Sequence, residues 1–210
     1  DDGLSVITID MAEDIGGTWY WNRYPGARCD IESVEYSYQF SDEVQQEWIW
    51  TERYASQTEI LSYINFVADK FSLRKYIQLN CRVESAVFDQ ENCGWSIILS
   101  TQEAILCRYL VLAVGNLSAP FVPSIDGRSK FSGVSCHTAR WPRSDIDLVG
   151  KKVGVIGTGS SGVQCIPLIA EQASQLFVFQ RTPAFTVPSR NKSIDKRWLS
   201  NFKLSYLEFR

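Results

Sequence analysis

The chain has 210 residues, 45% of them hydrophobic and 21% charged, which is ordinary for a globular protein and gives room for one large domain or parts of two. The formal net charge of −3 argues against a general nucleic-acid or polyanion surface. The longest apolar run, near residues 110–114, is too short for a bilayer, and the acidic start Asp1-Asp2-Gly3 is unlike a secretory signal, so we expect a cytoplasmic protein with neither a nucleic-acid nor a membrane partner.

The first half of the chain begins with a strand signal and later shows a helix signal. Leu4–Asp10 is predicted to be a buried strand that ends in an acid, and a tight loop follows at Ile15–Gly17. Thr18–Asp30 is aromatic and interrupted by glycine and proline, so an extended, irregular segment is expected there. Ser56-x-x-Glu59 is a capping box, and apolar residues then recur at helical spacing, namely Ile60, Leu61, Ile64, Val67, Ala68 and Phe71.

Strand signals dominate the next fifty residues. Cys81–Phe88 and Trp95–Leu99 are predicted strands joined by a turn at Asn92-Cys93-Gly94, and Ile105–Cys107 adds a short third strand. Tyr109–Val114 is an unbroken apolar run, which predicts a buried parallel strand. The last part reads strand, helix, strand over residues 152–156, about 161–173, and 176–179.

A glycine loop separates the first strand and the helix of that last part. Gly157-Thr158-Gly159-Ser160-Ser161-Gly162 fits the pattern G-x-G-x-x-G between a strand and a helix. In a dinucleotide site the first glycine allows the tight turn, the second lets the backbone approach a pyrophosphate, and the third permits close helix packing. The pattern alone is weak, and a plain tight turn is the alternative reading.

The residues after the following strand distinguish NAD from NADP. An NAD site usually places an acid there for the ribose 2′-hydroxyl, whereas this chain has Arg181 and Thr182. The forked donors of an arginine suit a 2′-phosphate, so we predict NADP. A solvated surface arginine is the alternative for Arg181.

Asp10 resembles the ribose-binding acid of a second dinucleotide fold, because it ends an apolar strand. Such an acid normally lies about twenty residues after a glycine loop, and only nine residues precede Asp10. Either the strand is an unrelated edge strand or the chain is truncated.

Cysteine and histidine usage gives no sign of a metal centre. The six cysteines include no C-x-x-C pair, and buried thiols in a reducing compartment are the favoured interpretation. His137 is the single histidine, which excludes a multi-histidine metal site.

Two segments closely resemble Baeyer–Villiger monooxygenases. Residues 16–30, GGTWYWNRYPGARCD, resemble the flavin-contacting stretch of that family. Phe131-x-Gly133-x-x-x-His137-x-x-x-Trp141-Pro142 matches the family fingerprint F-x-G-x-x-x-H-x-x-x-W-P, just ahead of the glycine loop. The resemblance covers essentially the whole chain, and the family pattern extends past both of its ends.

The resemblance implies an α/β fold with two incomplete dinucleotide-binding (Rossmann-like) domains. These would be a partial FAD domain at residues 1–124, a linker with the fingerprint at 125–149, and the first part of an NADP domain at 150–210. It implies a monomeric enzyme that uses FAD, NADPH and dioxygen to convert a ketone to an ester or lactone through a flavin peroxide.

The resemblance also implies roles for individual residues. Gly17, Thr18, Trp19 and Asp30 should lie along FAD, with Tyr36 a further contact, and Asp10 stands where the family commonly has a glutamate. Arg28, Cys29 and Asp30 should lie where flavin and nicotinamide meet. Asp30 would act in catalysis by orienting an arginine that lies outside the chain, although an Asx-turn is its structural alternative. Trp19 and Trp21 could equally be core aromatics. The fingerprint would couple NADP binding to domain rotation.

Three alternatives remain. A nitrogen- or sulfur-oxidising flavin monooxygenase would share both nucleotide folds, but its fingerprint typically lacks Trp141-Pro142. A flavin disulfide reductase needs a redox cysteine pair, and none is visible in the sequence. The 210 residues by themselves could be an inactive nucleotide-binding fragment.

Overall fold

The computed structural model describes residues 3–144 and 146–206, so Asp1 and Asp2 of the acidic start lie outside the described part. The chain forms two compact units, one of residues 1–20 and 64–120 and the other of residues 21–63 and 121–210. No described helix is long and apolar enough to cross a membrane. The domain boundaries expected from the sequence stay predictions.

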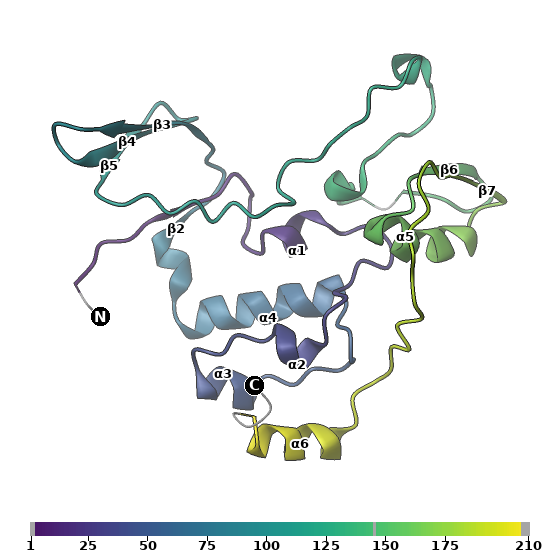
Figure 1. Ribbon diagram of the computed structural model, residues 1–210, viewed down its shortest axis with the longest axis horizontal. Coiled ribbons are helices and arrows are strands. Elements are labelled where there is room, and N and C mark those ends of the chain that lie inside the picture. The colour runs from purple at the N-terminus through teal and green to yellow at the C-terminus, as the bar shows by residue number, and fades with distance from the viewer. Residues whose placement is uncertain (1–2, 145, 207–210) are drawn as a thin grey trace. The chain divides into compact units, whose positions relative to one another are not determined.

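The first unit holds two small sheets (Figure 1). Strands β1 (Thr8–Ile9) and β2 (Ile77–Gln78) pair in parallel. Strands β3 (Val83–Asp89), β4 (Gly94–Leu99) and β5 (Ala104–Cys107) form an antiparallel sheet in that order, packed around a core of Cys81, Ile97 and Leu99. The three strands predicted in this region are confirmed, each with its bounds shifted by a residue or two at most.

The predicted turn between β3 and β4 forms for a reason that the sequence contains. The Asp89 carboxylate accepts hydrogen bonds from the backbone N–H of Glu91 at 2.9 Å and of Asn92 at 3.2 Å. Cys93 takes the left-handed conformation, with a φ of 48°, which reverses the chain. A carboxylate that bonds the backbone two and three residues ahead is a common way to start a turn.

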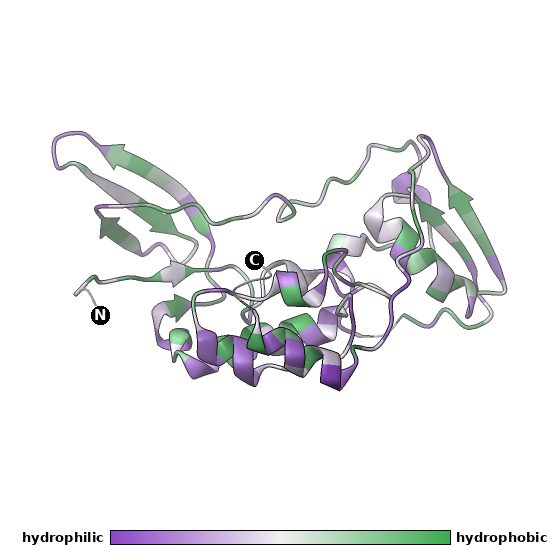
Figure 2. Ribbon diagram, turned by 60° about the horizontal axis from the view of Figure 1, so that its bottom comes forward, coloured by the Kyte–Doolittle hydropathy of each residue, from purple (hydrophilic) through white to green (hydrophobic). Residues whose placement is uncertain are grey.

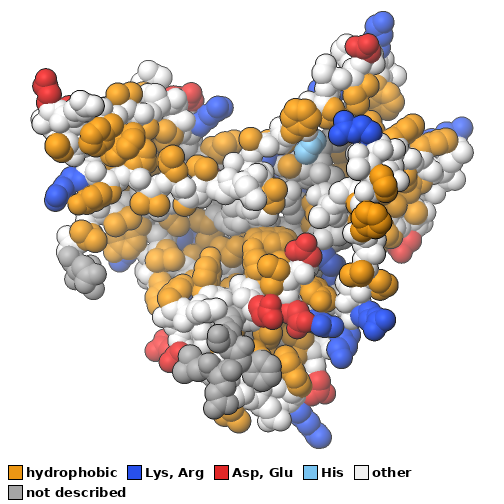
Figure 3. Space-filling view, in the orientation of Figure 1, with side chains coloured by type: hydrophobic (Ala, Val, Ile, Leu, Met, Phe, Trp, Pro, Cys, Tyr) orange, Lys and Arg blue, Asp and Glu red, His pale blue; other side chains and the backbone are white. Residues whose placement is uncertain are grey.

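One strand prediction in this unit is met only in part, and another is wrong. Only Thr8–Ile9 of the Leu4–Asp10 run is a strand, and Tyr109–Val114 forms none. Backbone groups become a strand only when a neighbouring strand bonds them, and within residues 3–144 and 146–206 the second run has no such neighbour. Leu110 packs against the core of Cys81, Ile97 and Leu99, but the other apolar side chains of the run are exposed, Val111 by 83%. Hydrophobic side chains reach the surface in large number (Figure 3).

The second unit contains the predicted strand–helix–strand. Strand β6 (Lys152–Ile156) is followed by helix α5 (Ser160–Ala170) and by β7 (Gln175–Phe179), which pairs with β6 in parallel. Hydrophobic residues predominate in both strands (Figure 2). Cys165 and Ile169 of α5 are buried with Tyr24, Ala27 and Leu148, and Val153, Val155 and Leu176 pack against them. This is a strand–helix–strand unit with parallel strands, the kind of unit on which dinucleotide folds are built.

The remaining helices are mostly short. They are α1 (Thr18–Trp21), α2 (Ser33–Tyr36), α3 (Asp42–Glu47), α4 (Gln57–Lys70), α6 (Lys196–Leu204) and three 3₁₀ turns at Leu73–Tyr76, Arg128–Lys130 and Thr138–Arg140. Helix α1 takes only the first four residues of the Thr18–Asp30 segment, which is otherwise irregular as expected. It forms because the carbonyls of Gly16 and Gly17 accept from the N–H groups of Trp19 and Tyr20, at 2.9 and 3.1 Å, which closes a helical turn.

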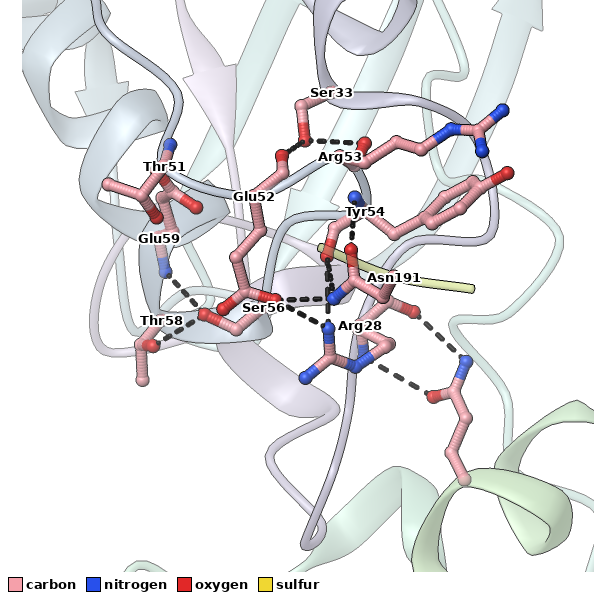
Figure 4. Close-up of polar contacts among 11 residues, drawn as sticks. Arg28, Ser33, Thr51, Glu52, Arg53, Tyr54, Ser56, Thr58, Glu59 and Asn191 are labelled. Carbon is pink, nitrogen blue, oxygen red and sulfur yellow. Dashed lines mark hydrogen bonds and ion pairs between the residues drawn. The ribbon is translucent and has the colours of Figure 1, made fainter. Parts of the chain in front are cut away.

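The capping box at the start of α4 is half formed. The Ser56 hydroxyl accepts from the Glu59 N–H at 3.4 Å, as predicted (Figure 4). The Glu59 carboxylate does not return the bond to Ser56 and instead accepts from the Thr51 N–H at 2.7 Å. The helix start is therefore tied to the preceding loop as well as capped.

Candidate functional site

The glycine loop has the geometry of an anion-binding helix start. Gly157 takes a φ of +100°, a conformation that favours glycine, directly after β6. Gly159 is the N-cap of α5, and no side chain caps the helix there, so the first backbone N–H groups are available to a ligand. A Cβ at Gly162 would lie 2.5 Å from the Gly157 carbonyl oxygen, so only glycine fits this approach of helix to loop.

The loop lies beside the end of β7. The Gly157 N–H donates to the Phe179 carbonyl at 2.9 Å, and the Gln180 amide donates to the Thr158 hydroxyl at 2.7 Å. Arg181 and Thr182 follow directly, and both are exposed. A Cβ at Gly159 would meet nothing within 4 Å, which leaves open space in front of the helix start. The structure thus brings together the predicted pyrophosphate loop and the predicted 2′-phosphate residues.

The second half of the aromatic stretch packs on α5 within the same unit. The Tyr24 hydroxyl donates to the Gln164 side-chain oxygen at 2.9 Å, and the Arg28 N–H donates to the same oxygen at 3.2 Å. Burial raises the pKa of the Tyr24 phenol, and a hydrogen bond with the Ser161 hydroxyl of the glycine loop partly offsets this rise. Asp30, the predicted catalytic residue, is exposed, and its negative charge also raises the pKa of Tyr24.

Arg28 is held by a polar network that sequence reasoning did not find (Figure 4). Its Nη1 donates to the Glu52 carboxylate at 2.9 Å and to the Tyr54 carbonyl at 3.0 Å. The Asn191 amide also donates to Glu52, and its oxygen accepts from the Tyr54 N–H at 3.0 Å. Residues 51–54 and 191–194 are far apart in the chain and run side by side through backbone bonds, so no local pattern predicts this network.

Two further predicted flavin residues lie in the second unit. Cys29 is buried, its N–H donates to the Ala55 carbonyl at 3.1 Å, and burial raises the pKa of its thiol. Tyr36 ends α2 and is 38% exposed.

Four predicted flavin residues lie in the first unit. Asp10 follows β1, and its carboxylate accepts from the Ala12 N–H at 2.8 Å. Gly17 has a φ of 50°, and Thr18 and Trp19 begin α1, Thr18 exposed and Trp19 half-buried.

The fingerprint residues lie on an irregular segment of the second unit. His137 is the N-cap of the 3₁₀ turn Thr138–Arg140, and its Nδ1 accepts from the Ala139 N–H at 3.1 Å. Trp141 packs against the buried cluster that contains Cys165, whereas Phe131 is 65% exposed and Gly133 is exposed beside it. Pro142 is half-buried. The residues described include no cluster of three or more potential metal ligands.

Gln164 is another residue that sequence reasoning missed, and here a signal existed. The stretch Val163–Ala170 is apolar apart from this glutamine, and a lone amide on the inner side of a packed helix needs polar partners. Those partners are Tyr24 and the Arg28 backbone, which the sequence analysis had assigned to the flavin stretch.

These features define an α/β protein with a glycine-loop unit of the dinucleotide-binding type. The sequence profile of the pyridine nucleotide-disulphide oxidoreductase family matches residues 30–207. The chain belongs to that family.

Individual relatives are monooxygenases by name. The chain is similar to phenazine N-monooxygenase PhzNO1 of Lysobacter antibioticus, with 46% identity over 97% of the chain and 38% of that relative. It is 44% identical to the acetone monooxygenase (methyl acetate-forming) of Gordonia sp. strain TY-5, over 92% of the chain and 36% of that relative. A crystal structure of OTEMO in complex with FAD and NADP matches with a TM-score of 0.94 and 43% identity, over 98% of the chain and 40% of that structure.

The chain therefore spans less than two-fifths of the length of these two curated relatives. The likeness confirms the expected α/β fold and the resemblance to Baeyer–Villiger monooxygenases.

Proposed function

We propose that the whole protein containing this chain is a Baeyer–Villiger monooxygenase that uses FAD, NADPH and dioxygen to convert a ketone to an ester or lactone. The observation that carries the proposal is the contact of the Tyr24–Arg28 segment with helix α5, whose first turn carries the glycine loop. Acetone monooxygenase, a relative at 44% identity, is named for forming methyl acetate, an ester made from a ketone.

The described residues fit an NADP pyrophosphate at the start of α5. Gly157, Thr158, Gly159, Ser160, Ser161 and Gly162 would surround it, because the uncapped first turn offers N–H donors and Gly159 leaves space in front of them. Arg181 and Thr182 would bind the 2′-phosphate beside the loop.

FAD would contact the residues that the sequence assigns to the flavin, namely Asp10, Gly17, Thr18, Trp19, Arg28, Cys29, Asp30 and Tyr36. The bound flavin supplies the oxygen-transfer chemistry, and the protein supplies position, charge and exclusion of water. The Glu52 carboxylate binds the Arg28 guanidinium and also accepts from the Asn191 amide, and Arg28 directly precedes Cys29 and Asp30. Asp30 would then orient an arginine from outside the chain toward the reacting centre.

The fingerprint residues Phe131, Gly133, His137, Trp141 and Pro142 would link NADP binding to rotation of the NADP domain over residues 150–210 against the FAD domain over 1–124. We also propose a cytoplasmic, monomeric protein.

Oxidation at nitrogen is the second candidate, because phenazine N-monooxygenase PhzNO1 is 46% identical to the chain. The Trp141-Pro142 ending of the fingerprint favours the ketone reaction over this alternative.

Product analysis separates the two. The purified whole protein, supplied with NADPH and dioxygen, is offered a panel of ketones, a thioether and an aromatic amine. The expected result is an ester or lactone from at least one ketone. Sulfoxide or N-oxide without any ester would overturn the proposal. The isolated 210 residues should bind FAD poorly and oxidise no NADPH, and stoichiometric FAD retention with NADPH oxidation would contradict that expectation.

A further inference from the structure

The side-chain amide of Gln164 joins helix α5 to the Tyr24–Arg28 segment through both of its ends. Its oxygen accepts from the Tyr24 hydroxyl at 2.9 Å and from the Arg28 N–H at 3.2 Å. Its Nε2 donates to the Arg28 carbonyl at 3.1 Å. Because the amide bonds both backbone groups of Arg28, it can hold that residue in only one orientation.

The segment approaches the helix so closely that only glycine fits at the contact. A Cβ at Gly26 would lie 2.7 Å from the Gln164 carbonyl oxygen and 2.9 Å from a methyl group of Leu168. Gly26 also takes a φ of +78°, which favours glycine. Tyr24 and Ala27 on either side are buried at 8% and 6% exposure, so the contact has little freedom to shift.

Gln164 therefore stands between the two ligand sites of the proposed function. It lies two residues after Gly162, on the same rigid helix whose first turn would bind the NADP pyrophosphate. Its partner Arg28 lies two residues before Asp30, at the place proposed for the meeting of flavin and nicotinamide. The Tyr24 hydroxyl donates to the Gln164 side-chain oxygen, so Tyr24 is held to the same helix.

We propose that Gln164 is a positioning residue that sets the distance between the NADP-binding helix and the flavin-binding segment, and so controls how well NADPH reduces the flavin. The proposal rests on the function proposed above. The amide touches neither nucleotide, and it acts through Arg28 and Tyr24. A displacement of about 1 Å between reacting groups can lower a rate by about a hundredfold, so the loss of three hydrogen bonds at this contact has a measurable effect.

The test uses the whole protein with FAD bound and compares Gln164→Leu, Gln164→Glu and Tyr24→Phe with the wild type. Gln164→Leu removes all three bonds, Gln164→Glu keeps the acceptor and removes the donor to the Arg28 carbonyl, and Tyr24→Phe removes one bond. The matched control is Gln172→Leu, at an exposed glutamine just past the end of α5. The measurements are the anaerobic rate of flavin reduction at saturating NADPH, the NADP⁺ dissociation constant, the change in the flavin absorption spectrum when NADP⁺ binds, and the thermal midpoint of unfolding.

We expect Gln164→Leu to slow flavin reduction at saturating NADPH by about tenfold or more, and to alter the NADP⁺-induced change in the flavin spectrum. The NADP⁺ dissociation constant should change by less than about threefold, because the pyrophosphate loop is left intact. Gln164→Glu and Tyr24→Phe should fall between this variant and the wild type, and Gln172→Leu should match the wild type.

A wild-type reduction rate and a wild-type spectral change in Gln164→Leu would overturn the proposal, as would a lowered thermal midpoint with no other change. Should Gln164→Leu fail to retain FAD, the more conservative Gln164→Glu and Tyr24→Phe decide by the same two readouts. If the wild-type protein makes no ester but the variants still show slower flavin reduction, the proposed function is wrong and this inference stands.

Discussion

The guanidinium group of Arg140 lies over the indole ring of Trp21, 4.3 Å from its centre. Arg140 belongs to the fingerprint segment and Trp21 to the aromatic stretch, and both lie in the second unit. Trp21 could have been a core aromatic or a functional residue on sequence grounds. It is half-buried, with a cation on its face, so it connects the two segments that carry the family resemblance.

A double-mutant cycle on this pair should show an interaction. With Arg140→Leu, Trp21→Leu and the double variant, we expect a coupling of about 0.5–1 kcal/mol in the free energy of unfolding, as is usual for such a contact. Arg108 and Tyr109 form the control pair. They are neighbours in the sequence, the Arg108 guanidinium lies 5.5 Å from the centre of the Tyr109 ring, and Tyr109 is 77% exposed. A coupling at Arg140 no larger than that of the control would show that the stacking contributes nothing.

Alanine substitution at two glycines of the loop should have different effects, a loss of stability at one and a loss of NADP⁺ affinity at the other. Gly162→Ala places a Cβ 2.5 Å from the Gly157 carbonyl oxygen, so we expect a loss of about 1–3 kcal/mol in the free energy of unfolding, the usual cost of overpacking. Gly159→Ala has space for its Cβ and an ordinary φ of −70°, so stability should hold while NADP⁺ affinity falls. Thermal unfolding and NADP⁺ titration of both variants check this, and equal effects on stability would contradict it.

Features that depend on residues close together in the sequence were predicted correctly, whereas features that depend on contacts between distant segments were not. The β3–β4 turn, the βαβ unit and the start of α4 follow from short-range patterns, and all three formed. The Tyr109–Val114 run is apolar enough for a strand, but strand formation needs a neighbour to bond it, which sequence periodicity does not supply.

The candidate site divides in the same way. The glycine loop and Arg181 were recognisable from residue type and spacing alone. Glu52 and Asn191 were not, because they meet across 139 positions of sequence through a backbone pairing of segments 51–54 and 191–194. The sequence around a polar loop residue such as Glu52 does not indicate a partner in a distant loop. The partner becomes evident only once the fold brings the two loops together.

The pair of Arg28 and Glu52 should stabilise the protein modestly. The two side chains are 31% and 35% exposed, so solvent screens the pair, and we expect Glu52→Gln to cost about 1 kcal/mol in the free energy of unfolding. Glu84→Gln is the control, since Glu84 is 48% exposed and lies 3.8 Å from Arg82. Raising the salt concentration should shrink the difference between wild type and Glu52→Gln, and a difference equal to that of the control would refute the role of the network.

Tyr24 should make stability depend on alkaline pH. Burial raises the pKa of its phenol above the usual 10.0 in the folded state. As the pH rises through 10.0, the unfolded chain releases this proton while the folded chain keeps it, so the contribution of Tyr24 is complete below that pH and is lost as the pH rises through the raised pKa. Tyr24→Phe cannot titrate, so its stability should decline less steeply in this alkaline region. Tyr109→Phe, at a 77% exposed position, should decline as the wild type does, and identical slopes in all three proteins would contradict the prediction.

Arg181 should decide between the two nicotinamide dinucleotides. It is exposed and directly follows Gln180, whose amide donates to the Thr158 hydroxyl of the glycine loop, so its side chain is accessible to a 2′-phosphate bound beside the loop. A hydrogen bond to a charged group contributes about 1.5–3 kcal/mol, and Arg181→Gln should therefore raise the KM for NADPH by about tenfold to a hundredfold. NADH lacks the 2′-phosphate, so its KM should change by less than about twofold. Arg190→Gln, at another exposed arginine of the segment after β7, should leave both KM values unchanged. An equal rise for both dinucleotides would mean that Arg181 supports the loop and does not read the phosphate.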